Sequence, residues 1–338
     1  MTPHVTVLMP VRNGGGYLRS AVASILGQTF EDFELLVVDD GSDDGSDALV
    51  ESFGDPRIRL VRNGSRLGLV ASLNRGLAEA RGAYVARADA DDECLPDRLA
   101  LQVPVLDAEP QVGVVGGWAE LVDAAGRTVG TLEPLLRDRV DFVFETLVMN
   151  VLIVHPAALM RLADLRSVGG YENVPVAEDK DLWRRLLLAG KEARIVEAPV
   201  LRYRLHREQV SRVRACVGRE SDARSQERFL AAVSSRVDPR RVRLALTGDA
   251  ELWRLQRVEA LRALDELPLL LGDAAGRFGL DGAERARLET RVEEHVAPVR
   301  RIAHSAARHA AAHARTSVRA ATAPIRASPL ARRLARRD

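Results

Sequence analysis

Short apolar runs and polar loops alternate along the first third of the chain. Four apolar runs, each followed by a polar loop, predict buried strands at residues 5–9, 34–38, 57–61 and 84–88. Helices are predicted between and after these strands, at residues 17–26, 46–52, 69–80 and 96–106. Such alternation is typical of a parallel sheet covered by helices on both faces, so we predict an α/β fold.

The pattern is looser in the middle of the chain. An apolar stretch covers residues 113–122, and Leu152-Ile153-Val154-His155-Pro156 and Gly169-Gly170-Tyr171 follow it. An amphipathic helix is predicted to open at Glu178-Asp179 and to end at Gly190, and a short strand is expected at residues 194–196.

The last part of the chain is predicted to be helical. Beyond residue 211, apolar residues recur at three-residue spacing and predict a helix that packs onto the rest of the protein. They are Leu252, Leu255, Val258, Leu261 and Leu264. Three glycines within residues 273–282 predict a break between helices.

Polar clusters follow several of the predicted strands. In open α/β sheets, ligands bind in the crevice at the carboxyl ends of the strands. Four clusters of this chain fall there: residues 10–13, residues 39–42, Arg66 and residues 89–92. We therefore expect them to converge on one binding crevice.

The densest of these clusters is Asp89-Ala90-Asp91-Asp92. Three carboxylates this close repel one another and raise each other's pKa unless a cation or backbone N–H groups neutralise them. If the preceding strand continued, Asp89 and Asp91 would point the same way. Oxygen ligands favour Mg²⁺ or Mn²⁺, and Mg²⁺ commonly shares its ligand sphere with substrate phosphates. The cluster thus indicates a nucleotide diphosphate site, the alternative being a solvated acidic loop that caps the next helix.

Composition narrows the class of protein. The chain has 338 residues, 46% apolar content and a net charge of +1, which suits a globular protein with a real core. Its two cysteines, Cys94 and Cys216, lie far apart, and neither a disulfide framework nor a zinc site is expected. We see no secretory signal and no run of ~18 apolar residues, so we predict a cytoplasmic protein. Dinucleotide (GxGxxG) and P-loop (GxxxxGK[ST]) motifs are absent from the sequence.

Taken in order, six motifs of this chain resemble glycosyltransferase family 2, the nucleotide-sugar transferases with the GT-A fold. The motifs are Val5-Thr6-Val7-Leu8-Met9-Pro10-Val11-Arg12-Asn13, Gln28-Thr29-Phe30, Glu34-Leu35-Leu36-Val37-Val38-Asp39-Asp40-Gly41-Ser42, Arg87-Ala88-Asp89-Ala90-Asp91-Asp92, Glu178-Asp179 and Tyr203-Arg204-Leu205-His206. The resemblance implies a Rossmann-like, mostly parallel sheet flanked by helices, with a helical C-terminal extension. It implies a catalytic domain at residues 1–211, divided into a nucleotide-sugar half (1–112) and an acceptor half (113–211). A helical extension (212–298) and an Arg/Ala-rich basic tail (299–338) would follow.

The same resemblance assigns a nucleotide site. It implies that Pro10 and Arg12 line the base pocket and that Asp40 accepts a hydrogen bond from uracil. Arg66 is similar to the family's nucleotide-contacting arginine, and Asp89 to the carboxylate near the ribose. The implied donor is a uridine or deoxythymidine diphosphate sugar.

The resemblance also assigns the metal and the base. Asp91 would hold Mg²⁺ or Mn²⁺ on the diphosphate, and His206 would complete the metal or phosphate contacts. Asp179 matches the family's catalytic base, with Glu178 placed to steady it. We expect the base to be an exposed carboxylate with an unperturbed pKa near ~4. One base opposite one leaving group indicates a single displacement with inversion.

The expected activity is transfer of one sugar to a hydroxyl of a glycan or lipid-linked acceptor, in cell-surface polysaccharide or glycolipid assembly. Single addition is favoured because the chain lacks the transmembrane helices and the Gln-x-x-Arg-Trp motif of the polymer synthases of the family. The alternative is a catalytically silent sugar-nucleotide-binding or scaffold protein of the same fold. A nucleotidyltransferase is disfavoured because the glycine- and lysine-rich triphosphate loop is missing.

Arg87 and the basic tail can each be interpreted in two ways. Arg87 either pairs with the acidic cluster or contacts phosphate. The tail either contacts an anionic membrane, placing the protein peripherally on the inner face of the plasma membrane, or is solvated or bound to a partner. Its arginines are Arg300, Arg301, Arg308, Arg315, Arg319, Arg326, Arg332, Arg333, Arg336 and Arg337. No aromatic residues are interleaved with them, so nucleic acid is not expected, and the oligomeric state stays open.

Overall fold

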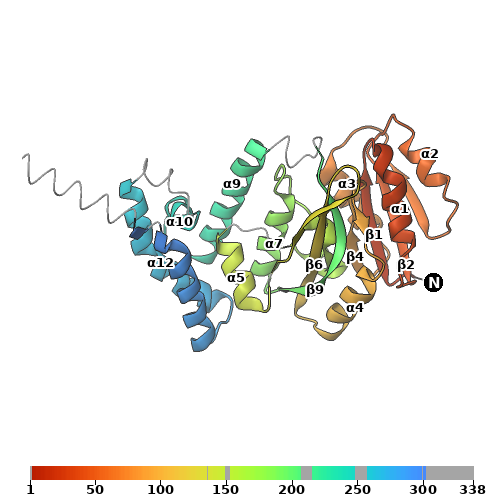
Figure 1. Cartoon of the computed structure of the whole chain (residues 1–338). Helices are drawn as coiled ribbons and strands as arrows, with labels where there is room; N and C mark the ends of the chain where they lie inside the picture. Colours follow the sequence, from red (N-terminus) through yellow and green to blue (C-terminus); the bar gives the residue numbers. More distant parts are fainter. Residues whose placement is uncertain are drawn as a thin grey trace, which may run out of the picture.

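The computed structural model describes residues 2–134, 136–148, 153–206, 215–247, 257–298 and 300–301. Within these residues, nine strands form one sheet in the order β3-β2-β1-β4-β8-β6-β9-β5, with β7 paired to β6. Figure 1 shows the sheet toward one end of an elongated molecule and the C-terminal helices at the other.

The first four strands are parallel neighbours. They are β1 (Val5–Val11), β2 (Phe33–Asp39), β3 (Ile58–Arg62) and β4 (Tyr84–Arg87). β1 lies between β2 and β4, with Val7 opposite both Leu35 and Ala86. The four predicted strands are therefore confirmed, and β1 and β2 are buried along their whole length.

Helices cover both faces of this parallel region, as expected. They are α1 (Leu18–Leu26), α2 (Ser46–Glu51), α3 (Leu69–Glu79) and α4 (Arg98–Ala108). Because side chains of a strand alternate between faces, the side chains of β1 pack into two separate hydrophobic cores. Leu8 packs in the cluster that contains Leu73 of α3. Val7 packs in the other cluster, with Val22 of α1 and Leu99 of α4.

The other half of the sheet is mixed. It contains β5 (Glu93–Cys94), β6 (Val112–Val122), β7 (Thr128–Leu132), β8 (Leu159–Arg161) and β9 (Glu192–Arg204). β8 is antiparallel to β4 and β6, whereas β6 and β9 are parallel. The short strand predicted at residues 194–196 was wrong in length, because β9 has 13 residues and pairs with β6 from Glu192 to Arg204. Its end also pairs with β5, Glu93 opposite Arg202, which brings the end of β9 to the acidic loop.

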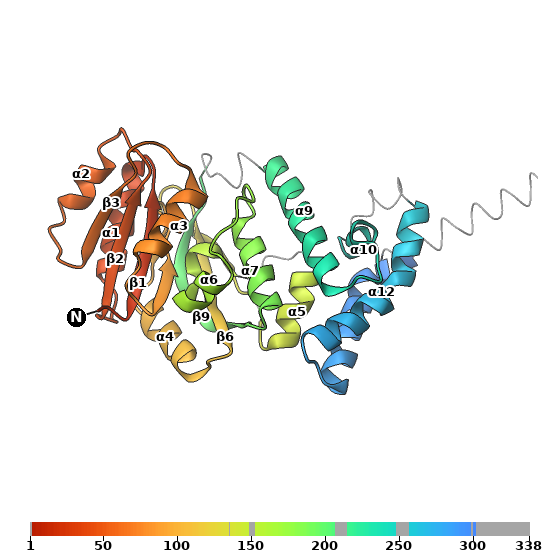
Figure 2. The ribbon, with the colours of Figure 1, turned by 180° about the vertical axis from the view of Figure 1, so that it is seen from behind.

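The other described helices are α5 (Arg139–Val148), α6 (Leu162–Ser167), α7 (Glu178–Leu188), α9 (Ala215–Val233), α10 (Pro239–Leu246) and α12 (Arg257–Arg277), with the short 3-10 turns η1 (Gly15–Tyr17) and η2 (His155–Ala157). Residues 282–298 are also helical. Helix α6 packs against β8 of the sheet. Figure 2 shows α7 and α5 between the sheet and the group of α9, α10 and α12. α7 thus joins the sheet to the C-terminal helices.

The C-terminal predictions are confirmed in part. Leu261 and Leu264 lie on α12, and Leu264 is buried in the core shared with α5 and α7. The break predicted within residues 273–282 is confirmed: α12 ends at Arg277, the chain turns at Gly279 with a φ of 62°, and residues 282–298 are helical again. Leu252 and Leu255 lie outside the described residues, as does the basic tail apart from residues 300–301. Among the described helices, none combines the length and apolarity needed to cross a bilayer.

Candidate active site

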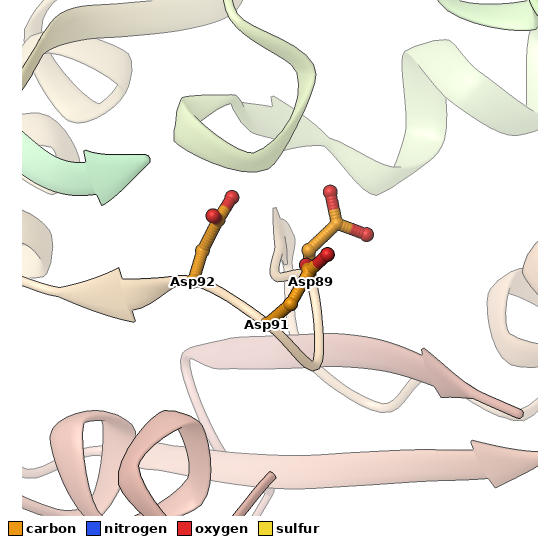
Figure 3. A group of neighbouring side chains, drawn as sticks. All are labelled: Asp89, Asp91 and Asp92. Atoms are coloured by element: carbon orange, nitrogen blue, oxygen red, sulfur yellow. The ribbon is translucent and has the colours of Figure 1, made fainter. Parts of the chain in front are cut away.

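Three carboxylates lie together in the loop after β4. The nearest oxygens of Asp89, Asp91 and Asp92 are within 4.8 Å of one another. Figure 3 shows the three side chains rising from the same side of this loop. β4 ends at Arg87, so the expected strand alternation does not apply here. The turn at residues 90–91 gathers the carboxylates instead.

Asp92 is the most deeply buried of the three, with 4% of its surface exposed. Its Oδ1 accepts a hydrogen bond from the backbone N–H of Arg204, at 2.8 Å. Its Oδ2 is buried and has no hydrogen-bond partner among the described residues. Burial, followed by the charges of Asp89 and Asp91, raises the pKa of Asp92 well above its ordinary value. An unpartnered buried carboxylate oxygen beside two other carboxylates fits a divalent cation, so the residues present suit the expected metal.

His206 and Asp91 lie in contact, as their assignment to one site requires. His206 Nε2 is 2.8 Å from Asp91 Oδ2. The His206 ring also lies 5.6 Å from the ring of Tyr17, in η1, and the Arg204 guanidinium stacks over that same ring at 4.7 Å. The glycine-rich loop after β1, the acidic loop after β4 and the end of β9 therefore meet at one place.

Arg87 pairs with the acidic loop, which supports the first of its two interpretations. The side chain is 2% exposed, and its Nη2 donates to Asp89 Oδ1 at 2.6 Å. Its charge also acts to lower the pKa of Asp92. Burying this cation under the carboxylates offsets part of their mutual repulsion.

Asp40 organises the neighbouring loop after β3. Asp40 Oδ1 accepts hydrogen bonds from Asn63 Nδ2 at 2.9 Å and from the Leu67 N–H at 2.7 Å, and Oδ2 accepts from the Gly68 N–H at 2.9 Å. Burial acts to raise the pKa of Asp40, but these donors outweigh it and the pKa is lowered. Gly41 permits the close approach of this loop, since its φ is 72° and a Cβ there would lie 3.2 Å from the Arg66 backbone N.

The other residues assigned to the nucleotide surround the same pair of loops. Pro10 is buried in β1 opposite Val38. Arg12 Nη1 donates to the backbone carbonyls of Asp40 and Gly41, at 3.0 and 2.9 Å. Arg66 is exposed in the loop that Asp40 holds. The fold thus gathers Pro10, Arg12, Asp40 and Arg66, and their contacts with a nucleotide remain a prediction.

The start of α7 carries Glu178 and Asp179. Asp179 is half-buried, and burial raises its pKa, so the expectation of an exposed carboxylate with an unperturbed pKa was wrong. Its Oδ1 accepts from the backbone N–H of Lys180 at 2.7 Å. Burial, followed by the charge of Asp179, raises the pKa of Glu178 to about 7. Sequence reasoning missed this environment because the helix start alone resembles an ordinary acidic first turn.

Tyr171 connects this helix with the acidic loop. Its buried hydroxyl is 2.8 Å from His155 Nε2. Burial raises the pKa of Tyr171, and the charges of Glu178, Asp179 and Asp89 raise it further, against the influence of Arg87. Burial, followed by the charge of Arg87, lowers the pKa of His155 well below its ordinary value. The acidic loop and the start of α7 therefore share one electrostatic environment around Tyr171, which the sequence signalled only through the Gly169-Gly170-Tyr171 motif.

Comparison with known proteins agrees with this arrangement. The model of the family "Glycosyl transferase family 2" matches residues 6–161. The putative glycosyltransferase EpsE of Bacillus subtilis is 31% identical over 56% of this chain and 68% of its own length. An uncharacterized glycosyltransferase of Haemophilus influenzae is 30% identical over 62% of this chain and 68% of its own length.

The chain belongs to glycosyl transferase family 2. Solved glycosyltransferases with the GT-A fold share its architecture. Residues 1–349 of S. aureus TarS, in complex with UDP-GlcNAc, match 90% of this chain and 92% of that one, with a TM-score of 0.57 and 15% identity. The mannosyltransferase PcManGT of Pyrobaculum calidifontis, in complex with GDP-Man and Mn²⁺, covers 86% and 79%, with a TM-score of 0.53 and 21% identity. The expected GT-A fold of this family 2 member is therefore confirmed.

Proposed function

We propose that this family 2 glycosyltransferase is a metal-dependent inverting enzyme. It transfers one sugar from a UDP- or dTDP-linked donor to a hydroxyl of a glycan or lipid-linked acceptor. The observation that carries the proposal is the unpartnered buried oxygen of Asp92 in a cluster that shares its electrostatic environment with Asp179. The TarS and PcManGT complexes with sugar nucleotides, one of them with Mn²⁺, support the donor class and the metal.

In this proposal the acidic loop binds the metal and the diphosphate. Asp91 and Asp92 would supply oxygens to Mg²⁺ or Mn²⁺, and His206, in contact with Asp91, would complete the site. Asp89, which accepts a hydrogen bond from Arg87, would contact the ribose. When bound, the ion stabilises the negative charge that builds on the departing diphosphate. Pro10 and Arg12 line the base pocket, Asp40 accepts a hydrogen bond from the base, and Arg66 contacts the nucleotide.

Asp179 accepts the proton of the attacking acceptor hydroxyl. A carboxylate whose pKa is raised is a stronger base than an ordinary one, provided that it stays ionised at the working pH. Burial gives Asp179 this property. Glu178, with a pKa of about 7, carries only part of a negative charge near neutrality and so adds limited repulsion beside the base. Inversion follows because one base acts opposite one leaving group.

The proposal is tested with a panel of nucleotide sugars. The full chain is heated with Mn²⁺ and each UDP-, dTDP- or GDP-sugar, because a ligand that binds only the native state raises the Tm. The donor that stabilises the protein is then incubated with glycan and lipid-linked acceptors, and the products are separated with and without a chelator. Sugar transfer that stops on chelation, with inverted anomeric configuration, supports the proposal. Stabilisation without transfer or hydrolysis by any donor would instead indicate a silent sugar-nucleotide-binding protein.

A further inference from the structure

Helix α9 lies outside the residues that the family model matches, yet its side chains form ion pairs and hydrogen bonds with α7, the helix that carries the candidate base. Asp222 of α9 is buried between two cations of α7. Its Oδ2 is 2.6 Å from Lys180 Nζ, and its Oδ1 accepts from Arg184 Nη2 at 2.7 Å. Lys180 and Arg184 are four residues apart, so one face of α7 is fixed by a single carboxylate.

A second contact holds the next face of the same helix. Asp181 Oδ1 accepts from Ser225 Oγ at 2.7 Å and from Arg228 Nη2 at 2.8 Å, both on α9. The Asp181 side chain is 4% exposed, and its bond to Ser225 is buried, whereas the Arg228 side chain is largely exposed. Two consecutive turns of α9 therefore bind the first turn of α7, where Asp179 lies.

A third contact reaches the loop before α7. Val176 has a φ of 63°, which is a strained conformation for a β-branched residue. Gly218 of α9 lies against it: a Cβ on Gly218 would be 3.2 Å from Val176 Cγ1. The absence of a side chain at Gly218 lets α9 approach this loop, only two residues before Glu178.

We propose that α9 is a positioning element of the active site and that Asp222, through Lys180, is a positioning residue for the candidate base Asp179. This inference rests on the proposed function. The helical extension is then part of the catalytic unit, and a boundary at residue 211 does not separate it from the chemistry.

The electrostatics of Asp179 supply a signature for this role. Lys180 and Glu178 are its neighbours on α7, Asp222 faces it from α9, and Tyr171 lies in the preceding segment. The Lys180 charge lowers the pKa of Asp179, whereas the Asp222 charge raises it. Removing the Asp222 carboxylate removes a negative charge that raises the pKa of Asp179. It also leaves the Lys180 ammonium without this partner, so its positive charge acts more strongly on Asp179, and both effects lower the pKa of the base.

The test compares two substitutions with opposite expected signs. In Asp222→Asn, the acid limb of the pH profile of kcat moves to lower pH, and kcat on the plateau falls about tenfold because the base is weaker and less well placed. In Lys180→Met, the acid limb moves to higher pH. A merely structural role would not move the two profiles in opposite directions. The KM for the donor should stay unchanged in both variants, since neither residue lies in the nucleotide site.

Asp273→Asn is the matched control. Asp273 pairs with Arg236 inside the extension and, like Asp222, joins two segments through a carboxylate. Its substitution should leave the pH profile in place. Acid limbs that coincide with the wild type in both test variants would overturn the inference.

A measurement without activity separates this inference from the proposed function. Amide hydrogen exchange at residues 174–181 should become faster in Asp222→Asn and remain as in the wild type in Asp273→Asn. If the wild-type protein transfers no sugar, the proposed function fails, and exchange alone decides whether α9 holds the start of α7. Unchanged exchange in Asp222→Asn would then overturn the positioning role.

Discussion

Two acidic loops flank β1 at the same edge of the sheet, and they are stabilised in opposite ways. Asp40, after β2, accepts three hydrogen bonds from the protein itself, and its pKa is lowered. Asp92, after β4, has a buried oxygen without a partner, and its pKa is raised. Burial acts to raise the pKa of both carboxylates, so the opposite sign of the two shifts comes from the groups around them.

The difference lies in the number of donors that each loop receives. The loop at residues 63–68 supplies Asp40 with backbone and amide N–H groups, and these hydrogen bonds fix the loop against the end of β2. The loop after β4 carries three carboxylates, of which Asp89 accepts a hydrogen bond from Arg87 and Asp91 contacts His206. A complete set of protein donors is typical of a structural role, whereas an incomplete one is typical of a site that binds an ion.

The largest expected effect comes from Asp179, which belongs to neither loop. Asp179→Asn should lower kcat about a thousandfold, because the acceptor hydroxyl loses its general base. Both acidic loops stay intact in this variant, so calorimetry should show donor and Mn²⁺ binding equal to the wild type. Unchanged turnover would refute the assigned base.

A smaller loss is expected from the loop after β4. Asp91→Asn, or chelation of the wild type, should reduce turnover about a hundredfold, because the leaving diphosphate loses its stabilising charge. Titration with Mn²⁺, followed by the Tm, gives a second measurement that does not depend on turnover. Equal Mn²⁺-induced stabilisation of wild type and variant would contradict the metal assignment.

For Asp40, the expected effect is on the stability of the protein. Asp40→Asn places an NH₂ group against a backbone N–H and should lower the free energy of unfolding by about 2 kcal/mol. The wild-type advantage should be complete above the ordinary aspartate pKa near ~4 and should be lost as pH falls through the depressed folded pKa. Denaturant unfolding of both proteins between neutral and acidic pH measures this, and a constant difference would contradict it.

The smallest expected effect is that of Asp92→Asn on stability, and its sign is opposite to that of Asp40→Asn. In metal-free protein, Asp92→Asn should raise the free energy of unfolding by about 1 kcal/mol, because a buried charge among like charges is removed. The Asn oxygen still accepts from the Arg204 N–H. The same substitution should weaken Mn²⁺ binding. A lower metal-free Tm together with unchanged Mn²⁺ binding would mean that Asp92 stabilises its loop and does not hold the ion.

Much of the donor-side architecture was accessible from local patterns. The four parallel strands, their helices and the convergence of the loops after β1, β2 and β4 follow from periodicity and from the direction of parallel strands. The longer β9 was missed because its pairing with β6 depends on contacts distant in the sequence. The burial of Asp179 was missed for the same reason, since its surroundings come from α9 and from the segment around Tyr171.

By itself, the amino-acid sequence determined the α/β class, the positions of the four parallel strands and the identity of the carboxylates, because these depend on local periodicity and residue type. The tertiary structure alone decided which carboxylates are satisfied, which are left without a partner, and that α9 grips the start of α7. Hydrogen-bond partners and burial come from segments far apart in the sequence, such as Asp92 and Arg204, which are 112 residues apart. No local pattern records such pairings, because they arise only when the sheet and the C-terminal helices pack together.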